Sequence, residues 1–344
     1  MSRTNQTRQA NDPDQAFAGR TWRQELARAF NNVAELLNEL ELDPAHEEAP
    51  ENILRDFPLR VPHGYVSRMR KGDYADPLLR QVLPIAEEAR EVPGFVADPV
   101  GDLASVRARG VLQKYRGRAL LIVTGACGVH CRYCFRRAYP YREASVVANE
   151  IENVLRLLNS DSSIEEVILS GGDPLSLSNG RLESLLTALS RIPHIRRIRL
   201  HTRLPIVLPE RVDRGLLRAF EQASKPLILV LHSNHANELD DTVAEGISKL
   251  GNCTNTLLNQ AVLLRGVNDS EDALAALSER LFEIGIMPYY LHQLDPVQGA
   301  AHFQVTDGRA RALIAAVTAR LPGYLVPKLV REIPGAPAKT LLVP

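Results

Sequence analysis

Three of the four cysteines in the chain lie within eight residues and could bind a metal centre. Cys127, Cys131 and Cys134 follow the spacing Cys-x3-Cys-x2-Cys, and the fourth cysteine, Cys253, lies far along the chain. Clustered thiolates suit soft metals and iron–sulfur clusters. A [4Fe–4S] cluster normally takes four cysteines, so three would leave one iron open to another ligand. A structural zinc site would need His130 as its fourth ligand, at a cramped spacing.

The cysteines follow an apolar run, and a glycine pair follows a second apolar run. Residues 119–123 predict a buried strand, so the cysteines lie on a loop at its carboxyl end, where α/β folds place their chemistry. Residues 164–169 predict another strand, followed by Ser170-Gly-Gly-Asp-Pro174. Two glycines let the backbone approach a ligand closely. By itself this second loop is a weak signal, because many such sequences are only turns.

The elements that must position these loops alternate regularly from Arg118 onward. Strands are expected near 119–124, 164–169, 195–202, 226–231, 256–263 and 286–292, and helices near 144–158, 179–191, 209–224, 238–250, 270–284 and 306–320. This alternation predicts βαβ units and a parallel sheet. The expected fold is therefore α/β, a partial (β/α)6 barrel of the TIM type that is open on one side.

Two segments flank this predicted core of residues 111–320. Residues 1–110 are expected to form a helical extension, with an amphipathic helix over 22–40 and a second helix over 77–90. Residues 321–344 contain several prolines and cannot form a long helix. This last segment is expected to be irregular, either a trailing linker or a cover over the barrel mouth.

Composition excludes several classes of protein. The 344 residues include 41 Lys+Arg and 41 Asp+Glu, and a net charge of zero argues against sequence-independent nucleic-acid binding. The polar first 15 residues do not resemble a signal peptide, and no apolar run approaches the roughly 18 residues of a membrane span. Clustered cysteines do not suggest a disulfide framework. We therefore expect a cytoplasmic protein that binds neither nucleic acid nor membrane.

The cysteine spacing, together with Arg136 and Arg137 after it, resembles the signature of the radical S-adenosylmethionine (SAM) enzymes. Within that group the chain is most similar to the lysine 2,3-aminomutases. Seven ordered stretches carry this resemblance: 114–118, 132–137, 201–205, 232–238, 259–269, 288–295 and 334–339. The resemblance implies conversion of L-α-lysine to (R)-β-lysine by a 5′-deoxyadenosyl radical and pyridoxal 5′-phosphate (PLP). The chain ends five residues after Lys339 and most resembles the short-form enzymes that supply β-lysine for modification of elongation factor P.

The resemblance also assigns the site residues. The three cysteines would hold a [4Fe–4S] cluster, and SAM would bind Gly171, Gly172, Asp173, Arg203 and Gln260. Lys339 would form a Schiff base with PLP, and Arg118 and Lys114 would bind the coenzyme as well. The substrate carboxylate would meet Arg136, and the ε-ammonium would meet Asp295 and Glu332.

Several alternatives stay open at this point. The substrate could be glutamate or arginine, or the pathway could be lysine breakdown. A non-catalytic binding module stabilised by a metal is a further alternative. An aminomutase of this kind implies an external electron donor such as flavodoxin or ferredoxin, and a homo-oligomer is possible.

Overall fold

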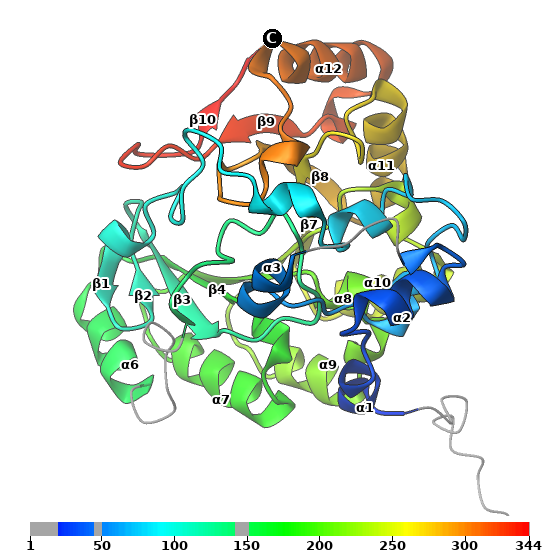
Figure 1. Cartoon of the computed structure of the whole chain (residues 1–344). Coiled ribbons are helices and arrows are strands. Elements are labelled where there is room, and N and C mark those ends of the chain that lie inside the picture. The colour runs from blue at the N-terminus through cyan, green and yellow to red at the C-terminus, as the bar shows by residue number, and fades with distance from the viewer. Residues whose placement is uncertain (1–19, 45–49, 142–150, 344) are drawn as a thin grey trace, which may run out of the picture.

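A ten-stranded sheet organises the chain (Figure 1). The computed structural model describes residues 20–44, 50–141 and 151–343. The strands occur in the sheet in the same order as in the sequence. They are β1 (Val106–Ala108), β2 (Val111–Leu112), β3 (Arg118–Thr124), β4 (Glu166–Gly171), β5 (Arg197–Thr202), β6 (Leu227–Leu231), β7 (Thr256–Leu263), β8 (Met287–Gln293), β9 (Lys328–Arg331) and β10 (Thr340–Leu341).

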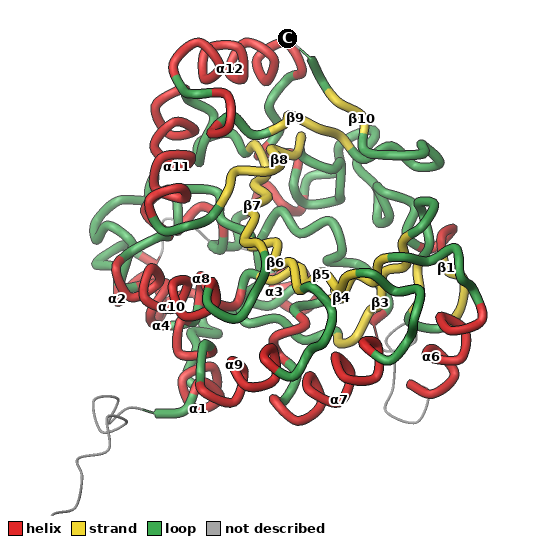
Figure 2. The backbone as a smooth tube through the Cα atoms, turned by 180° about the vertical axis from the view of Figure 1, so that it is seen from behind, coloured by secondary structure: helices red, strands yellow, loops and turns green. Residues whose placement is uncertain are grey.

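The strands β3 to β9 pair in parallel, whereas β1, β2 and β10 join the two ends of this run in antiparallel fashion. Parallel strands need crossover connections, usually helical. Six helices supply them: α6 (Ile151–Ser160), α7 (Asn179–Ser190), α9 (Arg214–Glu221), α10 (Asp241–Gly251), α11 (Glu271–Glu283) and α12 (Asp307–Arg320). Figure 2 shows the sheet as an arc with these helices along its outer side. The sheet does not close into a full barrel, because β1 and β10 each pair with one neighbour only.

The predicted α/β core is confirmed. All six predicted strands are present with ends within two residues of the expected ones. Five predicted helices correspond to α7, α9, α10, α11 and α12, although a 3-10 turn, η8 (Pro209–Arg211), replaces the start of the third. The sixth, expected over 144–158, appears as α6, and residues 144–150 lie outside the described residues.

The N-terminal extension differs from the expectation in two places. The helix expected over 22–40 is divided into α1 (Trp22–Ala27) and α2 (Val33–Glu39), because Phe30 leaves the helical path and bonds to the backbone of Val61 at 2.8 and 3.0 Å. The helix expected over 77–90 is wrong. Only two 3-10 turns form there, η3 (Leu79–Gln81) and η4 (Ala86–Ala89), since Pro84 interrupts any helix through this stretch.

Shorter elements complete the described chain. They are α3 (Glu51–Asp56), α4 (His63–Val66), η5 (Leu103–Ser105), η7 (Pro174–Ser176), α8 (Leu204–Val207), η9 (Ala236–Glu238), η10 (Ala301–Phe303) and η11 (Gly323–Leu325). None of the helices in the described ranges has both the length and the hydropathy that crossing a membrane requires.

The C-terminal segment is more regular than the sequence indicates. Strand β9 pairs in parallel with β8, with Leu329 opposite Leu291, and β10 folds back on β9. The prolines that argued against a helix lie outside both strands. The segment therefore extends the sheet past its six predicted strands and brings Glu332, Ala338 and Lys339 to the cavity described below.

One apolar core joins the N-terminal extension to the sheet. Trp22, Leu36 and Leu37 are buried in the same cluster as Leu121 and Leu200 from the central strands. The extension thus covers part of the barrel. The division at residues 110 and 320 stays a prediction, although the sheet itself continues across both positions.

Candidate functional site

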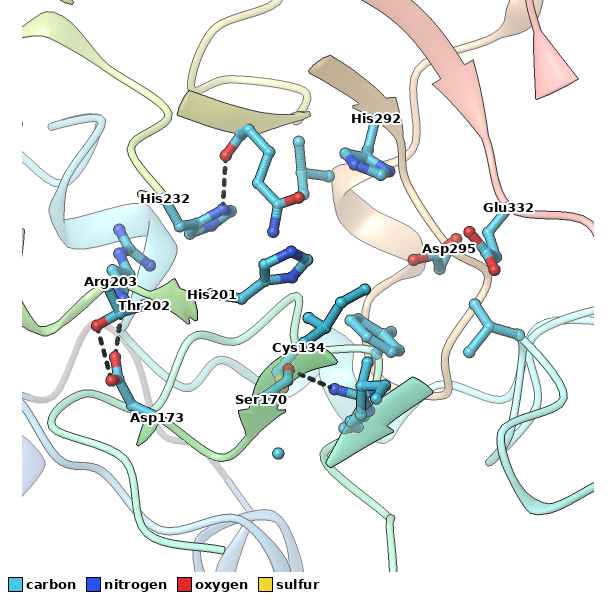
Figure 3. A pocket seen from close by; sticks show the side chains of 18 of the residues that line it. Cys134, Ser170, Asp173, His201, Thr202, Arg203, His232, His292, Asp295 and Glu332 are labelled. Carbon is cyan, nitrogen blue, oxygen red and sulfur yellow. Dashed lines mark hydrogen bonds between the residues drawn. The ribbon is translucent and has the colours of Figure 1, made fainter. Parts of the chain in front are cut away.

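All residues predicted to bind the cluster, SAM, PLP or the substrate line one cavity of about 380 Å³. This volume is within the range typical of small-molecule sites. The lining includes Lys114, Arg118, Cys127, Cys131, Cys134, Arg136, Gly171, Gly172, Asp173, Arg203, Gln260, Asp295, Glu332 and Lys339. Figure 3 shows labelled members from β4, β5, β8 and the loops that follow these and neighbouring strands, all facing the same space. The structure therefore brings the residues together, while the role of each remains a prediction.

The three cysteines present a donor set that fits an iron–sulfur cluster. Burial raises the pKa of Cys134 to about 11 and that of Cys127 well above its ordinary value, and neighbouring cysteines add to both shifts. Thiolates here would therefore need a bound positive centre. Within the described ranges no group of three His, Cys, Asp or Glu side chains is arranged to hold a single metal ion. His130 instead bonds through Nδ1 to the carbonyl of Pro58 at 2.8 Å, so nothing supports it as a zinc ligand.

The glycine pair packs directly against the cysteine loop. Gly171 has a φ of 116°, and a Cβ on Gly172 would come within 2.3 Å of the Ala126 carbonyl oxygen. The amide of Gly172 donates to Thr124 at 2.8 Å, and the next amide donates to Ala126 at 2.8 Å. The two glycines are therefore needed to seat one loop on the other, besides any contact with a ligand.

Asp173 is occupied by the protein itself. Its carboxylate accepts four hydrogen bonds, from the Thr202 hydroxyl at 2.7 Å and from the amides of Leu175, Arg203 and Leu204 at 3.0, 2.7 and 2.9 Å. These bonds use the acceptor positions of a carboxylate. The resemblance implied a SAM contact for Asp173, whereas the geometry shows a buried anchor that joins the loops after β4 and β5 (Figure 3).

Arg203 places a buried cation beside the cysteine loop. Its Nη1 lies 2.7 Å from the Cys131 Sγ, and its Nη2 donates to Glu238 at 2.9 Å and to Gln81 at 2.7 Å. Glu238 and Gln81 were not among the predicted site residues. Their positions, 35 and 122 residues from Arg203, leave no local signal that would have identified them.

A second buried group of ionic contacts holds the cysteine loop. It joins Arg132, which lies between Cys131 and Cys134, and Arg137, which follows Cys134, to one carboxylate. Arg132 and Arg137 both donate to Glu88, at 2.6 and 2.7 Å, and the side chains of Arg132 and Glu88 are fully buried. Both arginines belong to stretches that carried the resemblance, but Glu88 was missed. These contacts fix the cysteine loop to the N-terminal extension.

Arg136 lines the cavity and is held by Asp102. Its Nε donates to Asp102 Oδ2 at 2.6 Å, and its Nη1 donates to the Ser170 hydroxyl at 3.1 Å. The other oxygen of Asp102 lies 2.7 Å from the Lys114 ammonium. Burial alone would raise the pKa of Asp102, but Arg136 and Lys114 outweigh burial and hold that pKa below its usual value. Asp102 is 1% exposed and was missed by the sequence reasoning.

Two carboxyl groups lie at another part of the cavity, where Asp295 and Glu332 face each other (Figure 3). Glu332 bonds to the Lys339 ammonium at 2.6 Å and to the Tyr115 hydroxyl at 2.6 Å, and the Lys114 ammonium is 3.6 Å away. Burial raises the pKa of Asp295 to about 7, and the negative charge of Glu332 adds to the shift against the opposing effect of Lys339.

The middle of the cavity carries three histidines, His201, His232 and His292 (Figure 3). Burial lowers the pKa of each, to about 3 for His232, so all three are neutral near pH 7. The Nδ1 of His232 lies 2.9 Å from the carbonyl oxygen of Gln260. His201 and His292 lay in the stretches of resemblance without an assigned role.

A group of cations and tyrosines fits a phosphate-bearing coenzyme. The Arg118 guanidinium lies 5.1 Å from the centre of the Tyr115 ring, and Arg199 lines the same cavity. Burial raises the pKa of Tyr290 to about 12, while the charges of Arg199 and Arg118 act in the opposite direction. Two guanidinium groups at one wall suit an anionic ligand.

Comparison with known proteins identifies relatives over nearly the whole chain. The sequence model described as "Radical SAM superfamily" matches residues 121–219. The protein named L-lysine 2,3-aminomutase from Escherichia coli (strain K12) is 47% identical over 323 residues, which are 93% of this chain and 94% of that protein. The protein of the same name from Haemophilus influenzae is 41% identical, over 93% and 95% of the two chains. The one from Clostridium subterminale is 30% identical, over 94% and 78%.

One solved structure with a distant likeness comes from another organism. Streptococcus suis SuiB bound to its precursor peptide has a TM-score of 0.46 at 16% identity, over 64% of this chain and 49% of that one. By its extensive similarity to the proteins of that name, the chain belongs to the L-lysine 2,3-aminomutase family of the radical SAM superfamily.

Proposed function

We propose that the protein is an isomerase that converts L-α-lysine to (R)-β-lysine with a [4Fe–4S] cluster, SAM and PLP. The observation that carries this proposal is the distribution of charge in the cavity. A guanidinium at Arg136 and two carboxyl groups at Asp295 and Glu332 match the carboxylate and the distal ammonium of lysine. The cysteine loop and Lys339 line the same cavity.

The residues of the chain bind and orient the substrate. Arg136 is 7% exposed and, with Nε held by Asp102, it can present its remaining N–H groups to a carboxylate as a fork. Asp295 and Glu332 provide the anionic partners for the ε-ammonium. The neutral histidines of the cavity lining add polar groups without adding charge.

Each cofactor has a matching set of residues. When bound, the cluster and SAM supply a hydrogen-abstracting 5′-deoxyadenosyl radical, and PLP supplies an aldehyde that holds the substrate's α-amine. Cys127, Cys131 and Cys134 would hold the cluster. SAM would bind Gly171, Gly172, Asp173, Arg203 and Gln260, of which Gly172 and Arg203 contact the cysteine loop. Lys339 would hold PLP, with Arg118 at the phosphate.

An anaerobic assay tests the activity. The iron-reconstituted, PLP-loaded protein is incubated with SAM, a reductant and L-lysine, and β-lysine is measured. We expect β-lysine to form only when all three cofactors are present. Faster turnover of L-glutamate or L-arginine than of L-lysine would show that the substrate assignment is wrong, and iron binding without turnover would favour a binding module.

Cysteine substitutions test the cluster assignment. Replacing Cys127, Cys131 or Cys134 by Ala is expected to abolish the visible absorbance of the cluster and the activity together, because three thiolates are its only protein ligands. Cys253 is half-buried and is absent from the cavity lining, so Cys253→Ala is the matched control and should leave both unchanged. Full iron content in any of the three loop variants contradicts the assignment.

Peptide mapping tests the coenzyme lysine. Borohydride reduction of the PLP-loaded protein is expected to leave the label on Lys339, whose amine lines the cavity. Lys328 is exposed on β9 and is the nearest alternative in this segment. A label on Lys328 would mean that Lys328, and not Lys339, binds PLP, and that the C-terminal residues have been matched to the family in the wrong register.

The cellular setting is proposed on resemblance. We infer that β-lysine serves the modification of elongation factor P, rather than lysine breakdown, and that flavodoxin or ferredoxin delivers the electron in the cytoplasm. We also propose that the chain divides at residues 110 and 320 into an N-terminal extension, a core and a C-terminal segment. Loss of β-lysine from elongation factor P in a strain lacking this protein is the expected result.

A further inference from the structure

The lysine assigned to the coenzyme is paired with a carboxylate assigned to the substrate. The Lys339 ammonium lies 2.6 Å from Glu332 Oε2, with the two side chains 26% and 10% exposed. The other oxygen of Glu332 accepts the Tyr115 hydroxyl at 2.6 Å. Asp295 faces Glu332 across the same space (Figure 3). Both oxygens of Glu332 are therefore engaged by groups of the chain.

The Lys339 ammonium has the same chemistry as the distal end of the proposed substrate. Both are primary ammonium groups with three N–H donors at the end of a four-carbon stem. A second ammonium close to Oε2 would repel the first and would find no free lone pair in the direction that Lys339 occupies. The two groups therefore compete for one position.

We propose that the Asp295–Glu332 acid pair is a shared ammonium site, filled by Lys339 in the coenzyme-free chain and by the distal ammonium of the substrate in the loaded enzyme. This inference rests on the proposed function and extends it. The shared site links substrate binding to coenzyme loading. Lys339 occupies the acid pair until PLP is attached to it, and the substrate ammonium binds there afterwards.

The chemistry of attachment clears the site. Condensation of the Lys339 amine with the aldehyde of PLP forms a C=N bond, and the carbonyl oxygen leaves as water with two hydrogens taken from the amine. The nitrogen keeps at most one hydrogen, and its direction is set by the bond to the coenzyme. Glu332 thereby loses its donor in the resting loaded enzyme, and the vacated oxygen faces a ligand that can supply three. When the α-amine of the substrate later replaces Lys339 on the aldehyde, Lys339 leaves as a neutral amine, which does not compete as a cation for Glu332.

The position of Lys339 in the chain makes this exchange possible. It lies between β9 and β10, seven residues after Glu332 and directly before Thr340. Gly335, with a φ of 78°, turns the backbone between the two residues. The ion pair is thus a contact inside one short connection, and its loss leaves the strands β9 and β10 and their pairing intact.

Binding to the coenzyme-free protein provides the test. The full-length, cluster-containing chain without PLP is titrated calorimetrically with L-lysine and with L-norleucine, which lacks the ε-ammonium. The variant Lys339→Met keeps the length of the side chain and removes its charge. An intramolecular ammonium acts at an effective concentration on the order of millimolar or above, so this variant should bind L-lysine at least about tenfold tighter than the wild type. Binding of L-norleucine should not change.

Two further variants test whether tighter binding of L-lysine comes from freeing Glu332. Lys328→Met removes an exposed lysine from the same segment and should behave as the wild type. Adding Glu332→Gln to Lys339→Met should remove the gain, because the carboxylate that both ammonium groups need is gone. Circular dichroism and iron content establish that each variant is folded, and Lys339→Gln replaces Lys339→Met if the latter fails this check.

Equal affinity of the wild type and Lys339→Met for L-lysine would overturn the shared site, as would a gain that persists without Glu332. These outcomes are distinct from failure of the proposed function. If the loaded wild type forms β-lysine and the affinities are nevertheless equal, only the shared site is wrong. If the loaded enzyme does not act on L-lysine, the function itself is wrong.

Discussion

At the scale of single residues, the site contains buried carboxylates whose pKa values are shifted by their neighbours. Asp295 is enclosed beside a second acid, and its pKa of about 7 means that it is only partly ionised near neutral pH. Asp102, in contrast, lies between two cations that keep it ionised. Two aspartates in one cavity thus have different charge states because their neighbours differ.

Replacing Asp295 is expected to separate substrate binding from cofactor binding. Asp295→Asn should lose at least about 100-fold in kcat/KM for L-lysine, since removing one member of a buried charge pair costs about 3–5 kcal/mol. Iron and PLP content should stay normal, because Asp295 has no contact with the cysteines. Normal kcat/KM in this variant would show that the ε-ammonium binds elsewhere.

The pKa of Asp295 also predicts a pH dependence. The ammonium needs the ionised carboxylate, so kcat/KM for L-lysine should rise with pH through the raised pKa of Asp295, and this rise should be absent in Asp295→Asn. That pKa is about 7 with the Lys339 ammonium beside the acid pair, and attachment of the coenzyme to Lys339 moves it further upward, because the Lys339 charge lowers it. Stability should change in the opposite direction. The folded pKa lies above the unfolded value of about 3.9, so the contribution of this group to stability is lost as the pH rises through about 7. Thermal unfolding at pH 6 and 8 checks the sign.

Asp102 is expected to act by positioning Arg136. In Asp102→Asn one hydrogen bond can remain, but the charge that holds both Arg136 and Lys114 is lost. We expect KM for L-lysine to rise by about tenfold or more, in line with about 1.5–3 kcal/mol for a hydrogen bond to a charged group, with little change in kcat. Because the pKa of Asp102 is lowered, this effect should be the same from pH 6 to 9. A fall in kcat alone would contradict a positioning role.

At the scale of elements, the site is built where loops meet after neighbouring parallel strands. The loop after β4 reaches the cysteine loop after β3 through backbone hydrogen bonds at Thr124 and Ala126. The loop after β5 joins them through the carboxylate of Asp173. Strand β9 then carries the chain past β8 to Glu332. The register of adjacent strands therefore decides which loops can share a ligand.

Substitution of a glycine tests this packing. Gly172→Ala would place a methyl group 2.3 Å from the Ala126 carbonyl oxygen, so the cysteine loop must shift and iron content should fall severely. Gly180→Ala is the matched control. It lies in α7 with open space around its Cβ and should stabilise the helix by about 0.4–1 kcal/mol while leaving iron content unchanged. Normal iron content in Gly172→Ala would contradict the close approach of the two loops.

At the scale of the whole molecule, the N-terminal extension belongs to the same core as the sheet. Leu37 is fully buried there, and the guanidinium of Arg211 lies 4.7 Å from the centre of the Trp22 ring. The extension also carries Gln81, which binds Arg203 of the cavity lining, and Glu88, which binds Arg132 of the cysteine loop. It is therefore a structural support for the cavity as well as a cover.

Leu37→Ala should lower the free energy of unfolding by about 2–5 kcal/mol, the usual cost of a large cavity in a core. KM for L-lysine should not change while the protein is folded, because Leu37 lies outside the cavity lining. Val343→Ala, at a position that is 68% exposed, is the control and should change stability by less than about 0.5 kcal/mol. A small effect of Leu37→Ala in denaturant unfolding would show that the extension folds separately.

Features that depend on residues close together in the chain could be predicted from the sequence. Apolar runs predicted β4 and β6, whose residues are almost all buried, because strands buried on both faces need continuous apolar side chains. The spacing of the three cysteines indicated a site for a metal centre, because ligands that share one loop must be close in sequence. Prolines correctly excluded a C-terminal helix, but Pro84 was overlooked where it interrupts residues 77–90.

The tertiary structure alone decided the partners of those residues. Asp102 is 34 residues from Arg136, and Gln81 is 122 residues from Arg203, and no local pattern specifies such pairs. The pairing of β9 with β8 was also undecided by the sequence, because a four-residue strand with half of its residues buried carries little pattern. Whether Asp173 meets a ligand or the backbone depends on the fold of three loops. Long-range contacts arise from how the sheet curves, and that curvature is a property of the whole chain.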